Sequence, residues 1–250
     1  MFGLRWKLIA AKWRRALVYY IDDIERIEDA FLEELLPYVS LQRRAGANKY
    51  RFRSDRVQSV LAFVLLRIAL DTEYGWRMMP RLTTMKTGKP YLANLPGVHF
   101  NLSHCKKGVA CGISDSVLGV DIQDYVCFKE SLATRFMSEN ELHAAKAGDA
   151  DTAFTRLWSM KESYGKYTGR GICYDMPGFT AVEGVTPDGC ICQSHILENF
   201  VISVTSAEPL PLVCIHAAEL PERCRMLEKE SGAHAEAEKH PNLFRRRGER

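Results

Sequence analysis

The fold of this chain is decided by the stretch that begins with GVDIQ (residues 119–123) and ends with WSMKESYGK (residues 158–166). The first motif alternates apolar and polar residues, so it predicts a strand whose polar face carries Asp121. The second has helical spacing, which places Glu162 and Lys166 on one face of a helix. An acid on a strand and a Glu–Lys pair on a helix can converge on one divalent cation and one anionic ligand. Hard oxygen ligands beside lysines suit Mg²⁺ bridging phosphates, so the stretch indicates phosphate chemistry.

Further short motifs surround these two. They are RSDR (53–56) ahead of an apolar helix, GKPY (88–91), HFNLSH (99–104) and RFMSENE (135–141). Together with the first two motifs, and in this order, they resemble the 4′-phosphopantetheinyl transferases, specifically the large monomeric type that activates peptide and polyketide synthases. The resemblance covers about residues 40–172. Several signatures in the family's order are far more specific than any single one.

The resemblance implies an α+β fold of two similar halves related by a pseudo-twofold axis, with the active site in the cleft between them. On this basis residues 1–16 form a basic N-terminal extension, 17–115 the first half, and 116–219 the second half with the metal site. Residues 220–250 form a charged tail that we expect to be poorly ordered beyond a short helix. Because both sides of the cleft lie in one chain, we expect a monomer.

The activity that the resemblance implies is transfer of 4′-phosphopantetheine from coenzyme A to a serine of an apo acyl or peptidyl carrier protein. Adenosine 3′,5′-bisphosphate is the second product, and the carrier serves fatty acid, polyketide or nonribosomal peptide synthesis. A pyrophosphate leaving group needs a metal and positioned cations more than covalent help. We therefore expect Mg²⁺ as the cofactor, or Mn²⁺ in its place.

Three oxygen-bearing side chains are the expected metal ligands: Asp121, Gln123 and Glu162. Aspartate is unfavourable in strands, so Asp121 beside two β-branched residues indicates function. The commonest family pattern has a glutamate where this chain has Gln123, which can offer a carbonyl oxygen but cannot carry charge or accept a proton. The family acid that matches Glu162 also helps to deprotonate the serine, and the departure at Gln123 moves the base role further towards Glu162.

Lys161 and Lys166 are expected to bind the pyrophosphate oxygens and to act with the two acids in catalysis. By resemblance Ser103 and His104 meet the phosphates, with His104 near the 3′-phosphate. A Ser–His pair also occurs in serine hydrolases, but no acid at a usable spacing completes a triad here.

Lys89 and a basic run over residues 43–56 complete the expected coenzyme A site. Lys89 matches the family lysine that lies at the nucleotide. The region of the basic run contacts the 3′-phosphate in the family, and Arg43 and Ser59 fall nearest the matching positions by count. The alternative for this run is an ordinary solvated basic surface, as most charge runs are.

Two function classes other than a working transferase fit parts of the sequence. A catalytically inactive module that binds coenzyme A or a carrier protein needs the basic residues, but it does not need Asp121, Lys161, Glu162 and Lys166 together. A nucleic-acid-binding protein could use the basic run and the termini. However, the net charge is only +3 and no recognition motif is present, so we expect no nucleic-acid partner.

Composition indicates a globular protein of the cytoplasm. The 250 residues are 46% hydrophobic, enough for one large domain or two small ones. No run of about 18 apolar residues predicts a membrane span. The eight cysteines show no framework of short repeated spacings, which favours free thiols in a reducing compartment. Cys190 and Cys192 with His195 lack the second ligand pair of a zinc site.

Apolar spacing predicts mixed helices and strands along the chain. Ser54 or Asp55 is expected to cap a long helix, and Gly169 to end the helix that carries Glu162. The predicted helices span about 24–35, 57–68, 129–135, 140–147 and 151–168. The predicted strands span about 17–21, 98–100, 109–113, 118–122, 178–182, 189–193, 200–206 and 211–219.

Overall fold

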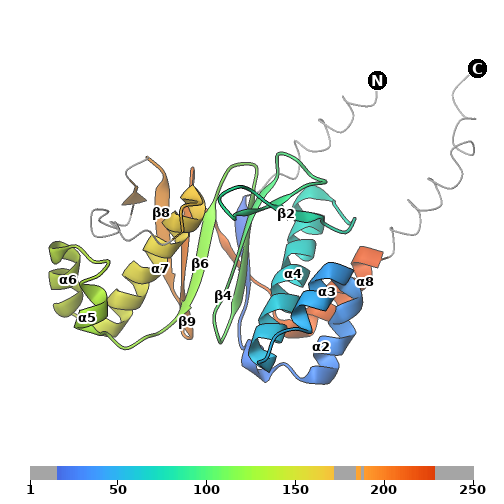
Figure 1. Ribbon diagram of the computed structural model, residues 1–250, viewed down its shortest axis with the longest axis horizontal. Coiled ribbons are helices and arrows are strands. Elements are labelled where there is room, and N and C mark those ends of the chain that lie inside the picture. Colours follow the sequence, from blue (N-terminus) through green and yellow to red (C-terminus); the bar gives the residue numbers. More distant parts are fainter. Residues whose placement is uncertain (1–15, 172–183, 187–188, 229–250) are drawn as a thin grey trace, which may run out of the picture.

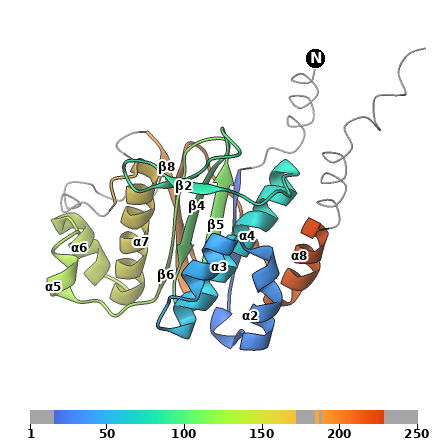
Figure 2. The ribbon, with the colours of Figure 1, turned by 45° about the vertical axis from the view of Figure 1, so that its right-hand side comes forward.

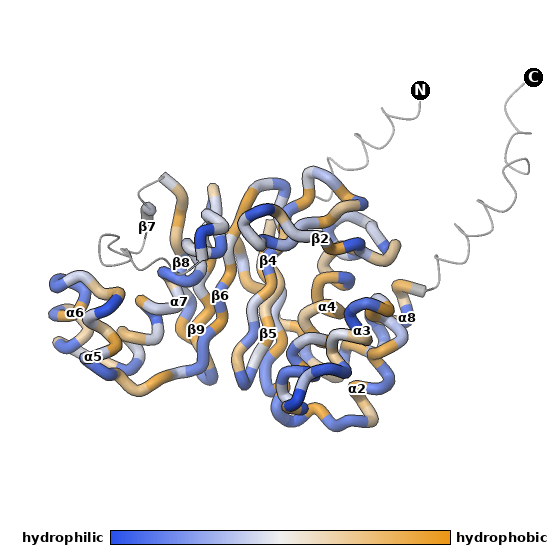
Figure 3. Tube along the Cα trace, in the orientation of Figure 1, coloured by the Kyte–Doolittle hydropathy of each residue, from blue (hydrophilic) through white to orange (hydrophobic). Residues whose placement is uncertain are grey.

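The computed structural model describes residues 16–171, 184–186 and 189–228. Two four-stranded sheets lie side by side, and each carries helices on its outer flank (Figure 1). Helix α4 packs on one sheet and helix α7 on the other. Figure 3 shows apolar residues running along the strands and the inner helices. One core lies between α4 and the first sheet, and a second lies where residues of both sheets meet, including Val18, Ala110, Val120 and Ile202.

The first sheet has the strand order β10-β1-β5-β4 and is antiparallel except for the β1–β10 pair. Its strands are β1 (Leu17–Ile21), β4 (His99–His104), β5 (Val109–Ser114) and β10 (Leu212–Cys214). The predictions of strands at β1, β4 and β5 are confirmed. The strand predicted over 211–219 is shorter than expected, because the chain turns into a 3₁₀ helix after β10.

Helix α4 (Arg53–Tyr74) covers the first sheet. It begins directly after Phe52, whose side chain makes no capping hydrogen bond. The prediction that Ser54 or Asp55 caps this helix is wrong, because both residues lie inside its first turn. There the Asp55 carboxylate is close to the positive end of the helix dipole, which favours it without a capping bond.

Short helical segments lead into α4. They are η1 (Ile24–Arg26), α2 (Asp29–Leu35), η2 (Leu36–Tyr38) and α3 (Leu41–Ala47). The single helix predicted over 24–35 is therefore divided. Helix α3 was not predicted; its N-cap is Ser40, whose Oγ accepts a hydrogen bond from the Arg43 amide at 3.1 Å.

A hairpin of β2 (Leu82–Thr84) and β3 (Pro90–Leu92) connects α4 to the first sheet. Its turn contains Gly88 with φ of 85°, a conformation that residues with side chains rarely adopt. Figure 2 shows the hairpin spanning from the end of α4 to the end of α7. The GKPY motif therefore lies where the first sheet's helices approach the helix of the second sheet.

The second sheet has the order β6-β9-β8-β7, with all neighbours antiparallel. Its strands are β6 (Gly119–Asp124), β7 (Gly184–Val185), β8 (Ile191–Ile196) and β9 (Phe200–Ser206). Helix α7 (Ala150–Thr168) packs on β6 and β9 and ends at Gly169, whose φ is 73°. The predicted helix end is thus confirmed. The strand predicted over 178–182 lies outside the described residues.

Gly119 brings α7 unusually close to β6. A Cβ atom at this position would lie 1.9 Å from the Ser163 carbonyl oxygen and 2.4 Å from the Tyr167 amide nitrogen. Both atoms belong to the backbone of α7, so no side chain can be accommodated without moving the helix. The glycine of the GVDIQ motif therefore sets the spacing between β6 and α7.

Helices α5 (Glu130–Ala133) and α6 (Glu139–Lys146) lie beyond α7, away from the sheets (Figure 1). Ser138 and Glu141 form a capping box at the start of α6. Both helices were predicted. The RFMSENE motif thus forms the connection between α5 and α6 and the first turn of α6.

After β9 the chain returns to the first sheet. It forms β10, η4 (Ala217–Glu219) and α8 (Leu220–Glu228), and α8 contacts α4 and α2. This corrects one expected boundary. The segment from β10 to Glu219 belongs with the first sheet and not with the second half, because β10 pairs with β1. The start of the charged tail forms the short helix that was expected there, and Leu220 and Cys224 anchor it because both are buried in the first core.

Residues 1–15 and 229–250 lie outside the described residues. Among the helices that the structure describes, none has the length and apolar character needed to cross a bilayer.

Candidate active site

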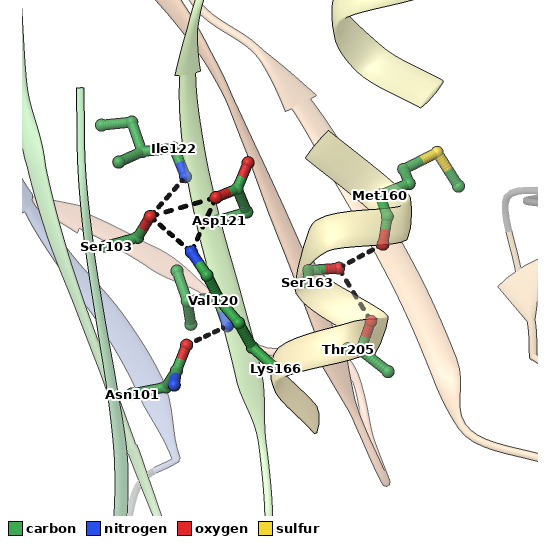
Figure 4. A network of polar contacts seen from close by, with 9 residues as sticks. All are labelled: Asn101, Ser103, Val120, Asp121, Ile122, Met160, Ser163, Lys166 and Thr205. Atoms are coloured by element: carbon green, nitrogen blue, oxygen red, sulfur yellow. Dashed lines mark hydrogen bonds and ion pairs between the residues drawn. The ribbon is translucent and has the colours of Figure 1, made fainter. Parts of the chain in front are cut away.

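The two sheets meet along β4 and β6, and side chains make the hydrogen bonds there. Asn101 Oδ1 accepts from the Val120 amide at 2.8 Å, and Ser103 Oγ accepts from the Ile122 amide at 3.3 Å (Figure 4). Backbone amides at a buried strand edge need acceptors, and here the neighbouring strand supplies them from its side chains. Asn101 was not predicted. The signal was present in HFNLSH, where two polar residues two apart interrupt a buried strand.

Asp121 lies at the centre of this junction and is only 5% exposed. Its Oδ1 accepts from Lys166 Nζ at 2.7 Å and from Ser103 Oγ at 3.1 Å, and Lys166 Nζ also donates to Ser103 Oγ at 2.8 Å. Figure 4 shows the three side chains converging from β6, α7 and β4. The structure therefore brings together three predicted site residues from three elements.

The second carboxylate oxygen of Asp121 is the feature that fits a cation. Asp121 Oδ2 is buried and has no hydrogen-bond partner among the described residues. A buried, unpaired carboxylate oxygen is unfavourable by itself, and a hard metal ion is a partner that would satisfy it. The residues present thus fit the divalent cation that the sequence predicts.

Glu162 adds a second acid to the site. Burial raises the pKa of this glutamate, the charge of Asp121 raises it further, and Lys166 acts in the opposite direction. The two carboxylates are therefore close enough to repel each other. Gln123 lies two residues after Asp121 on the same face of β6, half-buried, with its Nε2 3.4 Å from the Asp124 carbonyl oxygen. The predicted ligand set thus occupies one strand face and the helix beside it.

His104 ends β4 and connects these acids to the basic residues of α3. Partial burial lowers the pKa of His104 and Lys166 lowers it further; Asp55 and Asp121 raise it, and Arg43 lowers it slightly. The charges of the metal-site residues and of Arg43 thus all act on His104. A neutral imidazole in this position can donate to, or accept from, a phosphate oxygen.

Arg43 and Ser59, both predicted by counting alone, are in contact. Arg43 Nη1 donates to Ser59 Oγ at 3.3 Å, and its guanidinium lies 5.4 Å from the centre of the Phe63 ring. Burial lowers the pKa of Arg43. The contact shows that α3 and α4 present these two side chains together.

Both residues line a cavity of about 820 Å³ between α3, α4 and the β2–β3 hairpin. Lys49, Tyr50 and Arg81 also line it. A cavity with cationic and aromatic walls suits a ligand that carries both phosphate and a planar base.

Lys161 does not join this group. It is almost fully buried, its Nζ lies 2.8 Å from Glu141 Oε2, and it also donates to the Phe136 carbonyl oxygen. Residues adjacent on a helix point in different directions, so Lys161 cannot share the face of Glu162. The expectation that Lys161 binds pyrophosphate therefore conflicts with its position. Trp158 also packs against Phe136, with ring centroids 4.5 Å apart, and so supports the fold.

Lys89 differs from its expected position as well. Its Nζ donates to the carbonyl oxygens of Leu118 at 2.9 Å, Lys166 at 2.7 Å and Tyr167 at 3.2 Å. Burial lowers the pKa of Lys89 to about 8. These contacts place the amine at the end of α7, and Lys89 is not among the residues that line the basic cavity.

Comparison with known proteins agrees with this geometry. Residues 117–207, which include the whole of β6 and α7, match the 4′-phosphopantetheinyl transferase superfamily. The chain is 36% identical over 195 residues to the 4′-phosphopantetheinyl transferase psf-1 of Bacillus pumilus, covering 71% of this chain and 83% of that protein. It is 30% identical over 152 residues to the 4′-phosphopantetheinyl transferase Sfp of Bacillus subtilis, covering 59% of this chain and 68% of that protein.

A yeast relative matches a smaller part of the chain. The L-aminoadipate-semialdehyde dehydrogenase-phosphopantetheinyl transferase of Saccharomyces cerevisiae is 35% identical over 106 residues, 36% of this chain and 37% of that protein. The chain belongs to the 4′-phosphopantetheinyl transferase family. Within it, the chain is an enzyme of the Sfp type, the class that transfers phosphopantetheine to carrier proteins.

Proposed function

We propose that this enzyme transfers 4′-phosphopantetheine from coenzyme A to a serine of an acyl or peptidyl carrier protein, with Mg²⁺, and releases adenosine 3′,5′-bisphosphate. The observation that carries the proposal is the convergence of Asp121, Glu162 and Lys166 around a buried carboxylate oxygen that has no protein partner within the described ranges. Two acids and an ammonium at one point suit a metal-bound pyrophosphate.

Asp121 Oδ2, the Glu162 carboxylate and the side-chain oxygen of Gln123 would hold the metal. When bound, Mg²⁺ supplies positive charge that neutralises the pyrophosphate oxygens. Mn²⁺ accepts the same oxygen ligands and is the expected substitute. Because Gln123 is neutral, Asp121 and Glu162 provide all the negative charge of this ligand set.

The residues of the chain itself account for the proton and the leaving group. Glu162 accepts the proton of the carrier serine, directly or through one water, as the serine oxygen bonds to the β-phosphorus of coenzyme A. The bond between that phosphorus and the bridging oxygen of the pyrophosphate breaks, and Lys166 neutralises the departing phosphate. In the metal-free site, burial and the charge of Asp121 raise the pKa of Glu162.

The nucleotide end of coenzyme A is assigned to the basic cavity. Arg43 and Ser59 line this cavity, and the electrostatic influence of both Arg43 and Asp121 on His104 supports a position between cavity and acids. We therefore assign the 3′-phosphate to Arg43, Ser59 and His104, and the pyrophosphate to Lys166 and Ser103. Such charge-assisted contacts are the strong ones in phosphate recognition.

The architecture supports a cleft enzyme that works as a monomer. Each sheet carries one long helix, which is compatible with two similar halves related by a pseudo-twofold axis. Ser103 and Arg43 come from the first half, and Asp121 and Lys166 from the second. One chain thus supplies both sides of the proposed site.

The test is to incubate the protein with coenzyme A, Mg²⁺ and an apo carrier protein, and to follow the carrier by intact-protein mass spectrometry. The expected result is a mass increase equal to one phosphopantetheine, lost on chelation of the metal and restored by Mg²⁺. Asp121→Asn, which preserves side-chain size, is the matched control and should give almost no product. Binding of coenzyme A without any modified carrier, across several carriers, would contradict the proposal in favour of a binding module.

A further inference from the structure

One lysine from the β2–β3 turn reaches across to the other sheet. Lys89 Nζ donates to Leu118, just before β6, and to Lys166 and Tyr167 in the last turn of α7. An ammonium group has three N–H donors, and here each donor has one carbonyl acceptor. The side chain is thus fully hydrogen-bonded by backbone and has no remaining donor for a phosphate.

The carbonyl oxygens of Lys166 and Tyr167 need a donor from outside the helix. The last carbonyl groups of a helix have no partner within the helix, and they lie at the negative end of its dipole. Helix α7 ends at Thr168, so Lys166 and Tyr167 are in this last turn. A cation at this end therefore both satisfies open acceptors and stabilises the dipole.

The turn that carries Lys89 also packs tightly on the helix end. Gly169 terminates α7 with φ of 73°. A Cβ atom at Gly169 would lie 3.3 Å from Thr87 Oγ1 and 3.9 Å from Lys89 Cδ. The hairpin turn, including the stem of Lys89, therefore lies directly beside the end of α7 and leaves little room for a side chain at Gly169.

Lys166 is held at both ends by these contacts. Its carbonyl oxygen accepts from Lys89 at 2.7 Å, while its own ammonium donates to Asp121 at 2.7 Å and to Ser103 at 2.8 Å. A movement of the last turn of α7 would move the Lys166 ammonium relative to Asp121. Errors of about 1 Å at a reacting centre lower rates by about 100-fold.

We propose that Lys89 is a positioning residue that fixes the last turn of α7 and thereby holds Lys166 beside Asp121. The role of Lys166 in this inference rests on the proposed transferase function. The inference replaces the role of a nucleotide ligand, which the GKPY motif suggested for Lys89. Burial lowers the pKa of Lys89 to about 8, consistent with an amine enclosed by protein and not by solvent.

The experiment compares Lys89→Met with Lys86→Met, an exposed lysine of the same turn. Backbone hydrogen exchange is measured by mass spectrometry on peptides that cover residues 160–171, without any ligand. Lys89→Met should exchange faster there than the wild type, and Lys86→Met should not. Lys89→Gln keeps two donors and should lie between the two, which also serves if the methionine variant folds poorly.

Steady-state transfer with coenzyme A and with dephospho-coenzyme A, which lacks the 3′-phosphate, then separates positioning from nucleotide binding. A positioning role predicts that kcat falls about 10- to 100-fold in Lys89→Met with both donors, while the KM ratio of the two donors stays unchanged. Unchanged exchange over 160–171, or a selective rise in the KM for coenzyme A, would overturn the inference. If the wild type transfers nothing, the proposed function fails, while the exchange data still decide whether Lys89 holds the helix end.

Discussion

The buried pair of Lys161 and Glu141 gives the sharpest test of whether Lys161 belongs to the fold or to the active site. Both side chains are nearly inaccessible, at 3% and 4% exposure, and the ammonium has a second acceptor in the Phe136 carbonyl. Lys161→Met removes one charge and takes the Lys161 ammonium away from the buried Glu141 carboxylate. Breaking a buried pair in this way costs about 3–5 kcal/mol of unfolding free energy. For a protein of this size, that corresponds to a fall in Tm of about 6–20 °C.

The partner variant is Glu141→Gln, whose amide oxygen can still accept the Ser138 amide in the capping box. Burial lowers the pKa of Lys161 and Glu141 raises it, so a buried ammonium without this carboxylate, as in Glu141→Gln, is also unfavourable. The double variant contains neither charge. It should be more stable than Lys161→Met by at least about 1 kcal/mol, because the second substitution removes the buried carboxylate.

Urea unfolding followed by tryptophan fluorescence gives the free energies of all four proteins in this cycle, and transfer kinetics are measured well below each Tm. An unchanged urea midpoint in Lys161→Met together with a raised KM for coenzyme A would refute the argument. That result would support the original expectation that Lys161 binds the pyrophosphate of coenzyme A.

The remaining predictions concern the acids, the amide and the nucleotide end of the site. Glu162→Gln should lower the rate at saturating Mg²⁺ by about 100-fold or more. It should also raise Tm in metal-free buffer at pH 7. Burial and Asp121 raise the pKa of Glu162 in the folded protein, so the ionised carboxylate destabilises the fold. This gain in Tm should vanish below about pH 4, where Glu162 is protonated in both the folded and the unfolded protein. Calorimetry at the two pH values checks the sign, and equal Tm values at pH 7 would contradict it. Gln123→Glu should retain activity at a lower Mg²⁺ requirement, whereas Gln123→Ala should raise that requirement more than it lowers the saturated rate; Mg²⁺ titrations of the transfer rate decide between these outcomes. His104→Ala and Arg43→Ala should each reduce the preference for coenzyme A over dephospho-coenzyme A by about ten- to a hundredfold; an unchanged preference in kcat/KM would show that neither residue reads the 3′-phosphate.

The sequence predicts those elements whose own periodicity matches their final burial. Helix α7 and strands β1, β5, β6 and β9 follow from apolar spacing, and Gly169 marks the helix end. Helix α3 and the β2–β3 hairpin are too short for such a signal. Contacts with other elements contribute to holding α3, for example the Arg44 Nη2 donation to the Leu36 carbonyl at 2.6 Å. Boundaries set by tertiary contacts of this kind cannot be read from local spacing.

The site residues likewise divide into those that local spacing predicts and those that depend on tertiary contacts. Asp121, Glu162 and Lys166 are recoverable because strand alternation and the i,i+4 helix rule place them on faces that can meet. Lys161 breaks that rule, since it is adjacent to Glu162 and five residues from Lys166, so helix geometry alone argues against a shared face. The contacts of Lys89 could not be predicted, because its partners are backbone carbonyls 29, 77 and 78 residues away.

The return of the chain to the first sheet has a consequence for the order in which the protein can fold. Strands β6, β8 and β9 and helix α7 lie within residues 119–206, so the sheet that carries Asp121 is complete once that segment has left the ribosome. The first sheet, although it starts at β1, lacks its edge strand β10 and the cover of α8 until residue 228 has been synthesised. Domains usually fold in the order of synthesis. Here the later-encoded sheet can close first, and the earlier one must keep one edge of β1 open until β10 has been made.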